Sequence, residues 1–563
     1  MHSSALAGAL SLALAGGAVA ADQQVVAFDL PSQALGESLR DFYRASGEQI
    51  VFSESIVAGR RSPPLKGDYT PDQALALLLD GTNLTARRTS TGVVMIEAPQ
   101  SGSAAGGGAE VEALIVTAQK REENIQDVPI AMSAFTQESL TTHQIAGGPD
   151  LMTQIPNFTF TKTNFSGYSI QIRGIGTQAI SATVDPAVAV AFNNTPFIRN
   201  RFFEQEFYDL NRVEVLRGPQ GTLYGRNATA GVVNLLTARP RHVFEARLSA
   251  DVANYRSTRL EGMINLPLVD DSVALRLAGA WTKRDGYVTN GITGEPTDDR
   301  DLWSVRATLS FEPTDSIRAY LTFEHFEEDD GRLRSGKQLC TKHEPPAFLL
   351  PDEPDGGAFG RSTFISQGCQ MGSLYEDEAF QVPNGFALPY YGPLANVGLP
   401  LYPDIDPYLS TTQSKDLRVI ETTIEPEYKA KTDILHLSLE VDVTDGLTLT
   451  SETGYTADEL FSFNDYNRFN TTPGVFNPDQ EFGDARGKQI LDENGVFCDP
   501  QLGCADRLVA ADVSTARSDQ FSQEFRLSSN FDGPLNFHIG ANYLRYDTED
   551  KYYVFINTLT MYT

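Results

Sequence analysis

The side chains best suited to chemistry in this 563-residue chain are four cysteines, seven histidines and two pairs of adjacent carboxylates. The cysteines all lie in Pro-, Gly- and Asp-rich segments of the second half: Cys340, Cys369, Cys498 and Cys504. In an exported chain an even number of cysteines predicts disulfides, and sequence order favours Cys340 with Cys369 and Cys498 with Cys504. Zinc binding is the rival interpretation, but the spacings suit it poorly.

The carboxylate pairs and the histidines indicate no reaction. Glu327–Glu328 and Asp329–Asp330 would be the site of an exported hydrolytic or glycan-binding β-protein, but charge runs of this kind are usually only solvated. The histidines are scattered, and no nucleophile stands in a recognisable arrangement with a base. We therefore expect no enzyme, with no catalytic residue, no metal site and no cofactor.

Charge and length narrow the class of protein. The 74 acidic and 44 basic residues leave a net charge of -30, which argues against nucleic-acid binding, where a basic surface is expected. The excess of acidic residues either keeps the protein soluble or reflects long acidic loops that face the outside of a cell. The length predicts at least two domains.

Residues 1–21 are typical of a signal peptide for export. Small apolar residues dominate 5–15, and residues 18–20 fit a cleavage site before Ala21. The segment before Ala5 has no Lys or Arg, so the true start could lie upstream, and a buried Ala-rich helix is the alternative. Beyond residue 21 no apolar run is long enough for a spanning helix, so a membrane-inserted chain would cross as β-strands.

Residues 22–98 have the pattern of a small α/β domain. The expected elements are strands at 25–30, 50–52 and 65–69, a helix at 33–45, a second helix that begins at Pro71 with Thr70 as N-cap, and a closing hairpin of 84–89 and 93–96. The Gly-, Ser- and Ala-rich residues 99–111 then predict a flexible linker.

A short β-prone segment, residues 112–118, follows the linker. Its core is Leu114, Ile115, Val116, Thr117 and Ala118. A strand on a mobile tether has unpaired backbone donors and acceptors, so it can add itself to the edge of another protein's sheet. The alternative is that it is simply the first strand of the next domain.

Residues 119–240 are rich in turns. Within them the stretch 216–237 carries Gly218, Gly221, Gly225 and Gly231 and ends in an apolar strand. Glycines allow positive φ and close backbone approach, so the stretch predicts a compact domain of tight turns in a confined space. The Gly-x-Gly at 174–176 is no nucleotide fingerprint, because a third glycine and a following helix are missing.

From residue 241 onward the chain alternates apolar and polar residues over long strands. Residues 303–311, 317–324, 435–441 and 521–528 all alternate in this way. Tight Asp-, Gly- and Pro-containing turns alternate with long connections at roughly 284–300, 329–431 and 464–517. Short turns on one side and long loops on the other are typical of an outer-membrane β-barrel.

Taken together, these features resemble those of a TonB-dependent outer-membrane receptor over nearly everything after the signal. Residues 22–98 resemble the short N-terminal domain shared by secretins and signalling receptors, and 112–118 resemble the TonB box, with 114–118 as its core. The residues that resemble plug motifs are Arg173, Gly174, Arg217, Gly218, Pro219, Gly221, Tyr224, Gly225, Arg226 and Asn234.

The resemblance implies a mainly β fold: the small α/β N-terminal domain, an α+β plug at 119–240, and an antiparallel transmembrane β-barrel at 241–563. It also implies import of a large, scarce nutrient, most often an iron–siderophore complex, across the outer membrane. The implied partners are TonB of the inner-membrane energy complex, outer-membrane lipid, and an anti-sigma regulator that contacts 22–98 in the periplasm. Alternative cargoes are a carbohydrate, cobalamin or an aromatic compound, and a secretin-like channel component is the rival of another class.

Two departures from the family pattern stand out. The family closes its barrel with about 22 strands, whereas the alternation supplies nine by residue 548, so we expect a C-terminally truncated fragment that does not close a pore. In addition, Asn193–Asn194 stands where relatives usually carry an aspartate–glycine turn, and we expect the two asparagines to form that turn.

The plug arginines suggest how the plug is held. Arg173, Arg217 and Arg226 could pair with carboxylates on the polar inner wall of the barrel, for which Glu324, Glu440 and Glu524 are the hypothetical partners. The alternative is that these arginines donate to carbonyl groups inside the plug.

Overall fold

The computed structural model describes residues 26–46, 50–51, 57, 60–82, 84–88, 94–97, 114–121, 123–162, 168–178, 184–334, 336–343, 368–385, 407–408, 411–466, 469–476 and 490–560. It divides into two compact units, 1–112 and 113–563. The predicted signal at 1–21, the linker at 99–111 and residues 112–113 of the β-prone segment lie outside the described residues.

The first unit is a small α/β domain. Its strands are β1 (Val26–Leu30), β2 (Ile50–Val51), β3 (Leu65–Tyr69), β4 (Thr85–Arg88) and β5 (Val94–Glu97), and its helices are α1 (Leu35–Ser46) and α3 (Pro71–Leu79). These elements lie close to their predicted bounds. Thr70 caps α3 by accepting a hydrogen bond from the Gln73 backbone N–H at 3.4 Å, with Pro71 in the first turn.

The core of this domain forms where the two helices meet the strands. The strands make two small sheets, β1–β3 and β2–β5–β4. Leu35, Leu39 and Phe42 are spaced along one face of α1 and are almost fully buried, as are Leu75 and Leu78 of α3. This apolar spacing is what made both helices predictable from the sequence.

The second unit contains the plug, residues 119–240, with one short strand just before it. Its main sheet has five strands in the order β13–β12–β15–β14–β8, and a second sheet has the order β11–β10–β9. The strands are β6 (Ile115–Val116), β7 (Glu123–Asn124), β8 (Met132–Thr136), β9 (Phe158–Lys162), β10 (Tyr168–Ile172), β11 (Ile175–Gly176), β12 (Val188–Phe192), β13 (Thr195–Phe197), β14 (Leu210–Arg217) and β15 (Gly231–Thr237). Short helices α4 (Gln137–Thr142), η1 (Gly148–Thr153), η2 (Asn200–Glu204) and α5 (Gly221–Tyr224) complete it around an apolar core.

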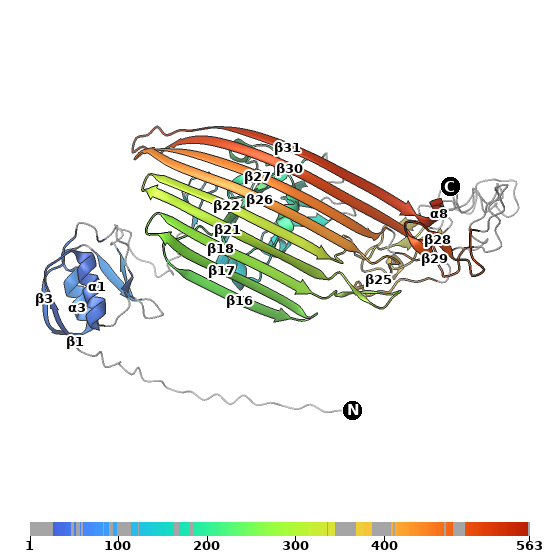
Figure 1. Ribbon diagram of the computed structural model, residues 1–563, viewed down its shortest axis with the longest axis horizontal. Helices are drawn as coiled ribbons and strands as arrows, with labels where there is room; N and C mark the ends of the chain where they lie inside the picture. The colour runs from blue at the N-terminus through green and yellow to red at the C-terminus, as the bar shows by residue number, and fades with distance from the viewer. Residues whose placement is uncertain are drawn as a thin grey trace, which may run out of the picture. The chain divides into compact units, whose positions relative to one another are not determined.

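Nine long strands form a second, larger sheet, which we call the wall sheet (Figure 1). They are β16 (Glu245–Ala253), β17 (Ser257–Val269), β18 (Val273–Arg284), β21 (Arg300–Thr314), β22 (Ile317–Asp330), β26 (Glu427–Thr444), β27 (Leu447–Asp465), β30 (Ala510–Ser529) and β31 (His538–Ile556). Neighbours are antiparallel and follow sequence order, with β16 and β31 at the two edges. The mainly β fold class predicted from the alternation is confirmed.

The long connections carry small elements of their own. These are β19 (Val288–Asn290), β20 (Pro296–Thr297), β23 (Thr341–Lys342), β24 (Cys369–Gln370), η3 (Asp377–Ala379), β25 (Val419–Ile420), β28 (Phe497–Asp499) and β29 (Gly503–Ala505), with α8 (Asn557–Thr560) after β31. One disulfide joins Cys340 to Cys369, and another joins Cys498 to Cys504 across β28 and β29.

The strands extend further into the long connections than the alternation predicted. β22 runs to Asp330 and β26 begins at Glu427, and β30 begins at Ala510 rather than near Arg517. The apolar alternation stops where the outward side chains become charged, but the backbone ladder between strands continues past that point. Hydropathy therefore marks the apolar part of a strand, not its hydrogen-bonded end.

The wall sheet is apolar on its exposed face and polar on its buried face. Along β21 and β22, Leu309, Phe311 and Leu321 are 37–50% exposed, whereas the alternating Ser310 and Thr322 are at most 2% exposed. This is the reverse of a water-soluble sheet, and it matches strands that face lipid outside and a polar lumen inside. In the part of the chain that is described, no helix is long and apolar enough to cross a bilayer.

Replacing Leu437 with Arg tests the lipid-facing assignment. Leu437 lies on the apolar face of β26 and is 40% exposed, and an Arg at such a position costs about 2–4 kcal/mol near the bilayer midplane. The free energy of unfolding in lipid vesicles, from urea titration, should fall by that amount. Asp329→Arg, on the same face but beyond the apolar rows, should change it by less than about 1 kcal/mol; equal losses at both positions would contradict the assignment.

Candidate functional site

The β-prone segment that follows the linker is docked against the plug. Ile115 and Val116 form β6 and pair with Asn124 and Glu123 of β7, and the backbone N–H of Ile125 donates to the Leu114 carbonyl at 2.9 Å. The expectation of an unpaired strand on a mobile tether is therefore wrong for residues 114–118 in this state. One edge of the segment is already occupied by the plug's own chain.

Apolar burial holds the same segment from a second side. Val116 and Ala118 are fully buried in a cluster with Leu216, Tyr224 and Val232 of the glycine-rich stretch. Ile115, which precedes Val116 and points to the opposite face, is 45% exposed. The segment therefore has one buried face and one open face, as expected for a strand laid on a surface.

A buried carboxylate holds Thr117. Glu214 of β14 has no exposed surface, and its Oε1 accepts from the Thr117 backbone N–H at 2.7 Å and from its Oγ1 at 3.2 Å. Arg212 donates from Nε to the same carboxylate at 2.7 Å and from Nη2 to Thr117 Oγ1 at 3.0 Å. We call Glu214, Arg212 and Thr117 the clamp. Hydrogen bonds to an ionised acceptor are among the stronger ones in proteins.

Just beyond the clamp the chain is tied to the wall sheet. Lys120 is buried, with positive φ, and its Nζ lies 2.6 Å from Glu524 of β30 and 5.1 Å from the centre of the Tyr224 ring. Burial lowers the pKa of Lys120, while the neighbouring Glu524 carboxylate opposes that shift. Residues 114–120 thus bridge the plug and the wall.

Glycine is required in the 216–237 stretch for two different reasons, a positive φ and a close backbone contact. Gly218 and Gly225 have φ of 108° and 75°, which L residues rarely adopt. Gly231 has an ordinary φ, but a Cβ there would lie 2.3 Å from the Leu216 carbonyl oxygen. Gly221 meets neither condition, so the expectation of a special role for it is wrong. Exposed Pro219 precedes α5 in this turn.

Asn234 supports the tight turn of the neighbouring hairpin. Asn193 and Asn194 both have positive φ, 47° and 68°, between β12 and β13, so the prediction that they form the turn is confirmed. Fully buried Asn234 accepts from the Asn194 backbone N–H at 3.1 Å and donates to its side chain at 2.8 Å. It also lies 3.5 Å from the hydroxyl of buried Tyr224.

The predicted ion-pair partners of the three plug arginines are wrong. Arg226 pairs with Asp185, and Arg217 donates to the Met132 carbonyl at 3.4 Å, both inside the plug. Arg173 lies exposed at the turn before Gly174, with a φ of 56°. Arg173 and Arg226 lie in turns of the plug and Arg217 ends β14, and the contacts of Arg217 and Arg226 stay within the plug.

The wall carboxylates named as partners have other cations. Glu324 pairs with Arg306 of the neighbouring strand at 2.6 Å. Glu440 lies 3.2 Å from Arg239 at the end of the plug, and Glu524 lies 2.6 Å from Lys120. Plug cations do meet wall carboxylates, but these cations are not the ones in the glycine motifs.

Further charge pairs fasten the plug to the wall, and the sequence analysis missed them. Arg201 pairs with Asp458, Glu206 with Arg259 at 2.7 Å, and Asp209 with Arg276 at 2.5 Å. Charged residues at inward positions of the wall strands were the only feature of the sequence that could have indicated these ion pairs. Their partners lie in plug segments 53 to 257 positions away, and no sequence pattern links the two sides.

Two cations, Lys162 and Arg332, hold the carboxylate of Glu204 in the plug. Burial by itself would raise its pKa, but Arg332, together with Lys162 at 2.9 Å, brings the pKa of Glu204 down to about 2. The carboxylate therefore stays ionised at neutral pH. Among the described residues, no group of His, Cys, Asp and Glu could hold a metal ion.

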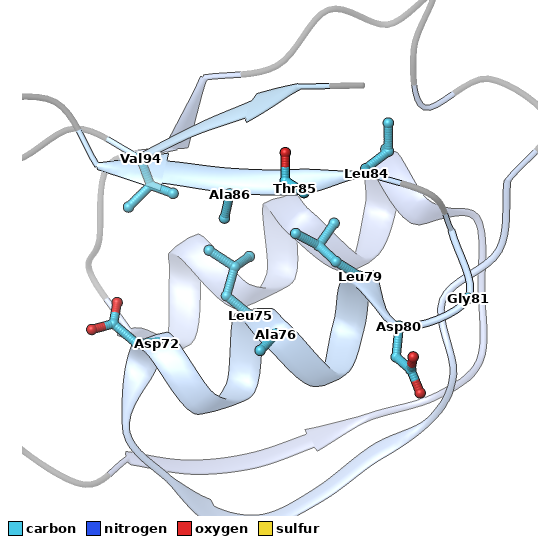
Figure 2. Close-up of a pocket in the computed structure, with 10 residues that line it drawn as sticks. All are labelled: Asp72, Leu75, Ala76, Leu79, Asp80, Gly81, Leu84, Thr85, Ala86 and Val94. Carbon is cyan, nitrogen blue, oxygen red and sulfur yellow. The ribbon is translucent and has the colours of Figure 1, made fainter. Parts of the chain in front are cut away.

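The small N-terminal domain has a concave surface of its own. Figure 2 shows Leu75 and Leu79 of α3 directed toward β4, with Asp72 and Asp80 at opposite ends of the helix. Leu84 and Val94 complete the apolar lining, and the hollow measures about 830 Å³. Its apolar floor with acidic ends could accept a segment of another protein.

Two family profiles match the chain. Residues 124–232 match the TonB-dependent Receptor Plug Domain, and residues 49–99 match the Secretin and TonB N terminus short domain. The first covers the plug from β8 to the start of β15, including the clamp residues Arg212 and Glu214 and the glycine-rich stretch as far as residue 232. The second includes every residue that lines the concave surface in Figure 2.

Several curated proteins are similar over part of their length. The Ferripyoverdine receptor of Pseudomonas aeruginosa is 26% identical over 301 residues, which cover 50% of this chain and 36% of the receptor. The Ferric-pyoverdine 358 receptor of Pseudomonas putida is 24% identical over 49% of this chain and 35% of its own. The Iron-regulated outer membrane virulence protein of Vibrio cholerae is 29% identical over 36% and 31%. The matched regions thus span about a third of these relatives.

Solved structures share the fold. The ferripyoverdine receptor of the outer membrane of Pseudomonas aeruginosa, bound to ferripyoverdine, aligns with a TM-score of 0.50 at 16% identity, over 94% of this chain and 57% of that one. The same receptor with heterologous pyoverdines gives 0.51. The chain thus carries a TonB-dependent receptor plug domain and a secretin and TonB N-terminal short domain, and it shares the fold of these outer-membrane receptors.

Proposed function

We propose that this chain takes part in importing an iron–siderophore complex across the outer membrane, with energy delivered through TonB. The protein resides in the outer membrane, and its N-terminal domain is periplasmic. The names of the similar curated proteins, which are receptors for ferric pyoverdines, support this class of ligand. Carbohydrate, cobalamin and aromatic cargoes remain the alternatives.

The observation that carries the proposal is the docked state of residues 114–120. The segment has the composition of a strand that pairs with a partner, yet β7, the clamp and the apolar cluster occupy it. A partner strand can add to it only after these contacts open. Ligand occupancy on the far side of the plug would favour opening, and TonB would then bind the released strand.

The ion pair between Lys120 and Glu524 connects the released segment mechanically to the wall sheet. A pull on 114–118 reaches Lys120 first, and then Glu524 of the wall through their ion pair. The plug contacts the wall by ion pairs such as Arg201–Asp458 and Asp209–Arg276, which water can replace one at a time. Such an interface can yield under force while the apolar core of the plug keeps its own fold. No covalent chemistry is needed.

We further propose that residues 22–98 contact an anti-sigma regulator and so couple ligand occupancy to transcription. The match of residues 49–99 to the secretin and TonB short domain supports this, and the concavity of Figure 2 supplies a surface for such a contact. Secretins share this short domain, but the plug match at 124–232 favours the receptor over a secretin-like channel.

Glu214→Gln should loosen the docked segment. The amide keeps the shape of the carboxylate but removes the charge that Thr117 and Arg212 bond to, at a cost of about 1.5–3 kcal/mol. Hydrogen exchange at the amides of 115–118 should become roughly tenfold to a hundredfold faster. Glu138→Gln, an exposed carboxylate of α4, is the matched control and should exchange as the parent does. Unchanged exchange in the Glu214 variant would rule out the clamp.

Val116→Pro should abolish energy-dependent uptake and spare ligand binding. Proline has no backbone N–H for a partner strand and is excluded from strand interiors. The measurement is uptake and surface binding of radioactive ferric pyoverdine by cells that express the receptor. Val116→Ile, which keeps both the N–H and the β-branched shape, should transport normally. Uptake by the proline variant at the control rate would contradict the coupling role of this segment.

Deleting residues 22–98 separates signalling from transport. Because these residues form their own unit, the plug and wall sheet should fold without them. Expression of the uptake genes in response to ligand, followed with a reporter, should be lost, and uptake of ferric pyoverdine should stay within about twofold of the parent. Induction that survives the deletion would refute the signalling proposal.

A further inference from the structure

The connection that follows β22 begins with a short segment, residues 331–334, which we call the strap. Its two arginines, Arg332 and Arg334, are 3% and 6% exposed although they lie outside any strand or helix. Arg334 pairs with Asp512 of β30 and donates to Ser514 Oγ of the same strand at 3.1 Å. Because β26 and β27 stand between β22 and β30 in the wall sheet (Figure 1), the strap crosses the polar inner face of the wall.

Backbone hydrogen bonds fix the path of the strap. Three consecutive backbone N–H groups donate to aspartate carboxylates: Gly331 to Asp299 at 3.0 Å, Arg332 to Asp330 at 3.1 Å, and Leu333 to Asp298 at 2.9 Å. Two of these aspartates belong to the connection between β18 and β21. Hydrogen bonds to ionised acceptors are among the stronger ones in proteins. The strap is therefore an ordered part of the structure that also joins two connections.

Arg332 joins the strap to the plug. Its Nη2 pairs with Glu204 and donates to the hydroxyl of Tyr168 at 3.2 Å, and both of these residues belong to the plug. On the wall side, Nη1 donates to Glu328 at 3.2 Å, and Cζ lies 4.3 Å from the centre of the Tyr428 ring. The two tyrosine hydroxyls are 2.9 Å apart. One side chain from a connection thus contacts the plug and the wall at the same time.

Burial makes this junction costly to open. The side chains of Arg332, Glu204 and Glu328 are 2–6% exposed. Lys162 also pairs with Glu204 at 2.9 Å, and Arg300 with Glu328 at 3.1 Å. Without Arg332, each carboxylate would lose a cation in a site that is nearly free of solvent, and removing one partner of a buried ion pair is strongly destabilising. We therefore expect the strap and this part of the plug to move together.

The connection 331–426 is anchored differently at its two ends. At its exit, the Thr423 backbone N–H donates to Asp465 of β27 at 3.0 Å, and the Asn290 side chain donates to the Thr422 carbonyl at 3.0 Å. These contacts join the exit to the wall and to a neighbouring connection, whereas the entry also holds the plug. Long connections of such sheets face the outside of the cell. A displacement of this connection from outside would therefore reach the plug at Arg332.

We propose that Arg332 couples the outward-facing connection 331–426 to the plug. The inference rests on the proposed import function and names a positioning residue for it. When a ligand shifts the connection, the strap moves, and Glu204 and Tyr168 move with it because the buried charges stay paired. Coupling between sites is reciprocal, so a displaced plug also shifts the connection. Arg332 is buried, so it acts through Glu204 rather than by contact with the ligand.

Glu204→Gln tests the coupling with little change of shape. The amide removes the charge that holds Arg332 to the plug, while Glu328 and the Tyr428 ring still hold Arg332 to the wall. Hydrogen exchange at the amides of 114–118 is measured in the purified full chain with and without ferric pyoverdine. In the parent, ligand should speed this exchange roughly tenfold, within the usual range of coupling between sites. In the variant, the acceleration should fall below about twofold.

Further readouts separate coupling from a merely structural role. Without ligand, exchange at 114–118 in the Glu204 variant should match the parent, and its affinity for ferric pyoverdine should stay within about threefold. Arg332→Gln should lose the ligand response in the same way, and the double variant should lose no more than either single one, because both act at one contact. Asp512→Asn removes a wall carboxylate that pairs with the same strap, and this matched control should respond as the parent does.

The outcomes distinguish this inference from the proposed function. A parent whose exchange does not change with ferric pyoverdine would overturn both. If the parent responds and Glu204→Gln responds equally, only the coupling through Arg332 is overturned. Faster exchange of the Glu204 variant without ligand, or an equal loss of response in Asp512→Asn, would also overturn the coupling, since each would mark a structural role.

Discussion

The structure depends on one constraint, which is that the interior of a bilayer offers no hydrogen-bond partner to a backbone amide. The wall sheet meets it by pairing each strand with its neighbours over long registers, from Leu447–Ser529 to Asp465–Ala511 in the longest case. Lipid outside then selects apolar side chains such as Leu309 and Leu437, and the alternation of the strand puts Ser310 and Ser438 on the other face. A polar inner wall is the direct consequence.

A polar wall decides how the plug is held. An apolar plug surface would leave the wall's charged groups unpaired, which is costly when they are buried. The plug instead presents charges of its own, as in Arg201 with Asp458, Asp209 with Arg276, and Glu204 with Arg332. Its apolar residues, including Phe203 and Val215, form a core that takes in one wall residue, Ile434, and Tyr208 packs on Ala278 and Ala280 of the wall. The plug is therefore held together mainly by apolar burial, whereas ion pairs predominate among its contacts with the wall.

Residues 114–120 combine both kinds of contact in seven positions. Val116 and Ala118 are held by apolar burial, Thr117 by the charged clamp, and Lys120 by the wall carboxylate Glu524. Their local pattern is that of an ordinary β-prone strand, and this made the segment predictable as a strand that pairs with something. The local pattern could not show whether the pairing partner is the plug or another protein, because a strand that pairs with either has the same sequence features.

The sequence by itself determined the class of fold, the small N-terminal domain with its Thr70 cap, the lipid-facing alternation and the Asn193–Asn194 turn. All of these depend on neighbours within a few positions, where helix and strand periods and backbone sterics act. Only the tertiary structure decided that Glu214 clamps Thr117, that Lys120 rather than Arg217 meets Glu524, and that Arg201 meets Asp458. These contacts join residues 97 or more positions apart, and no local period encodes them.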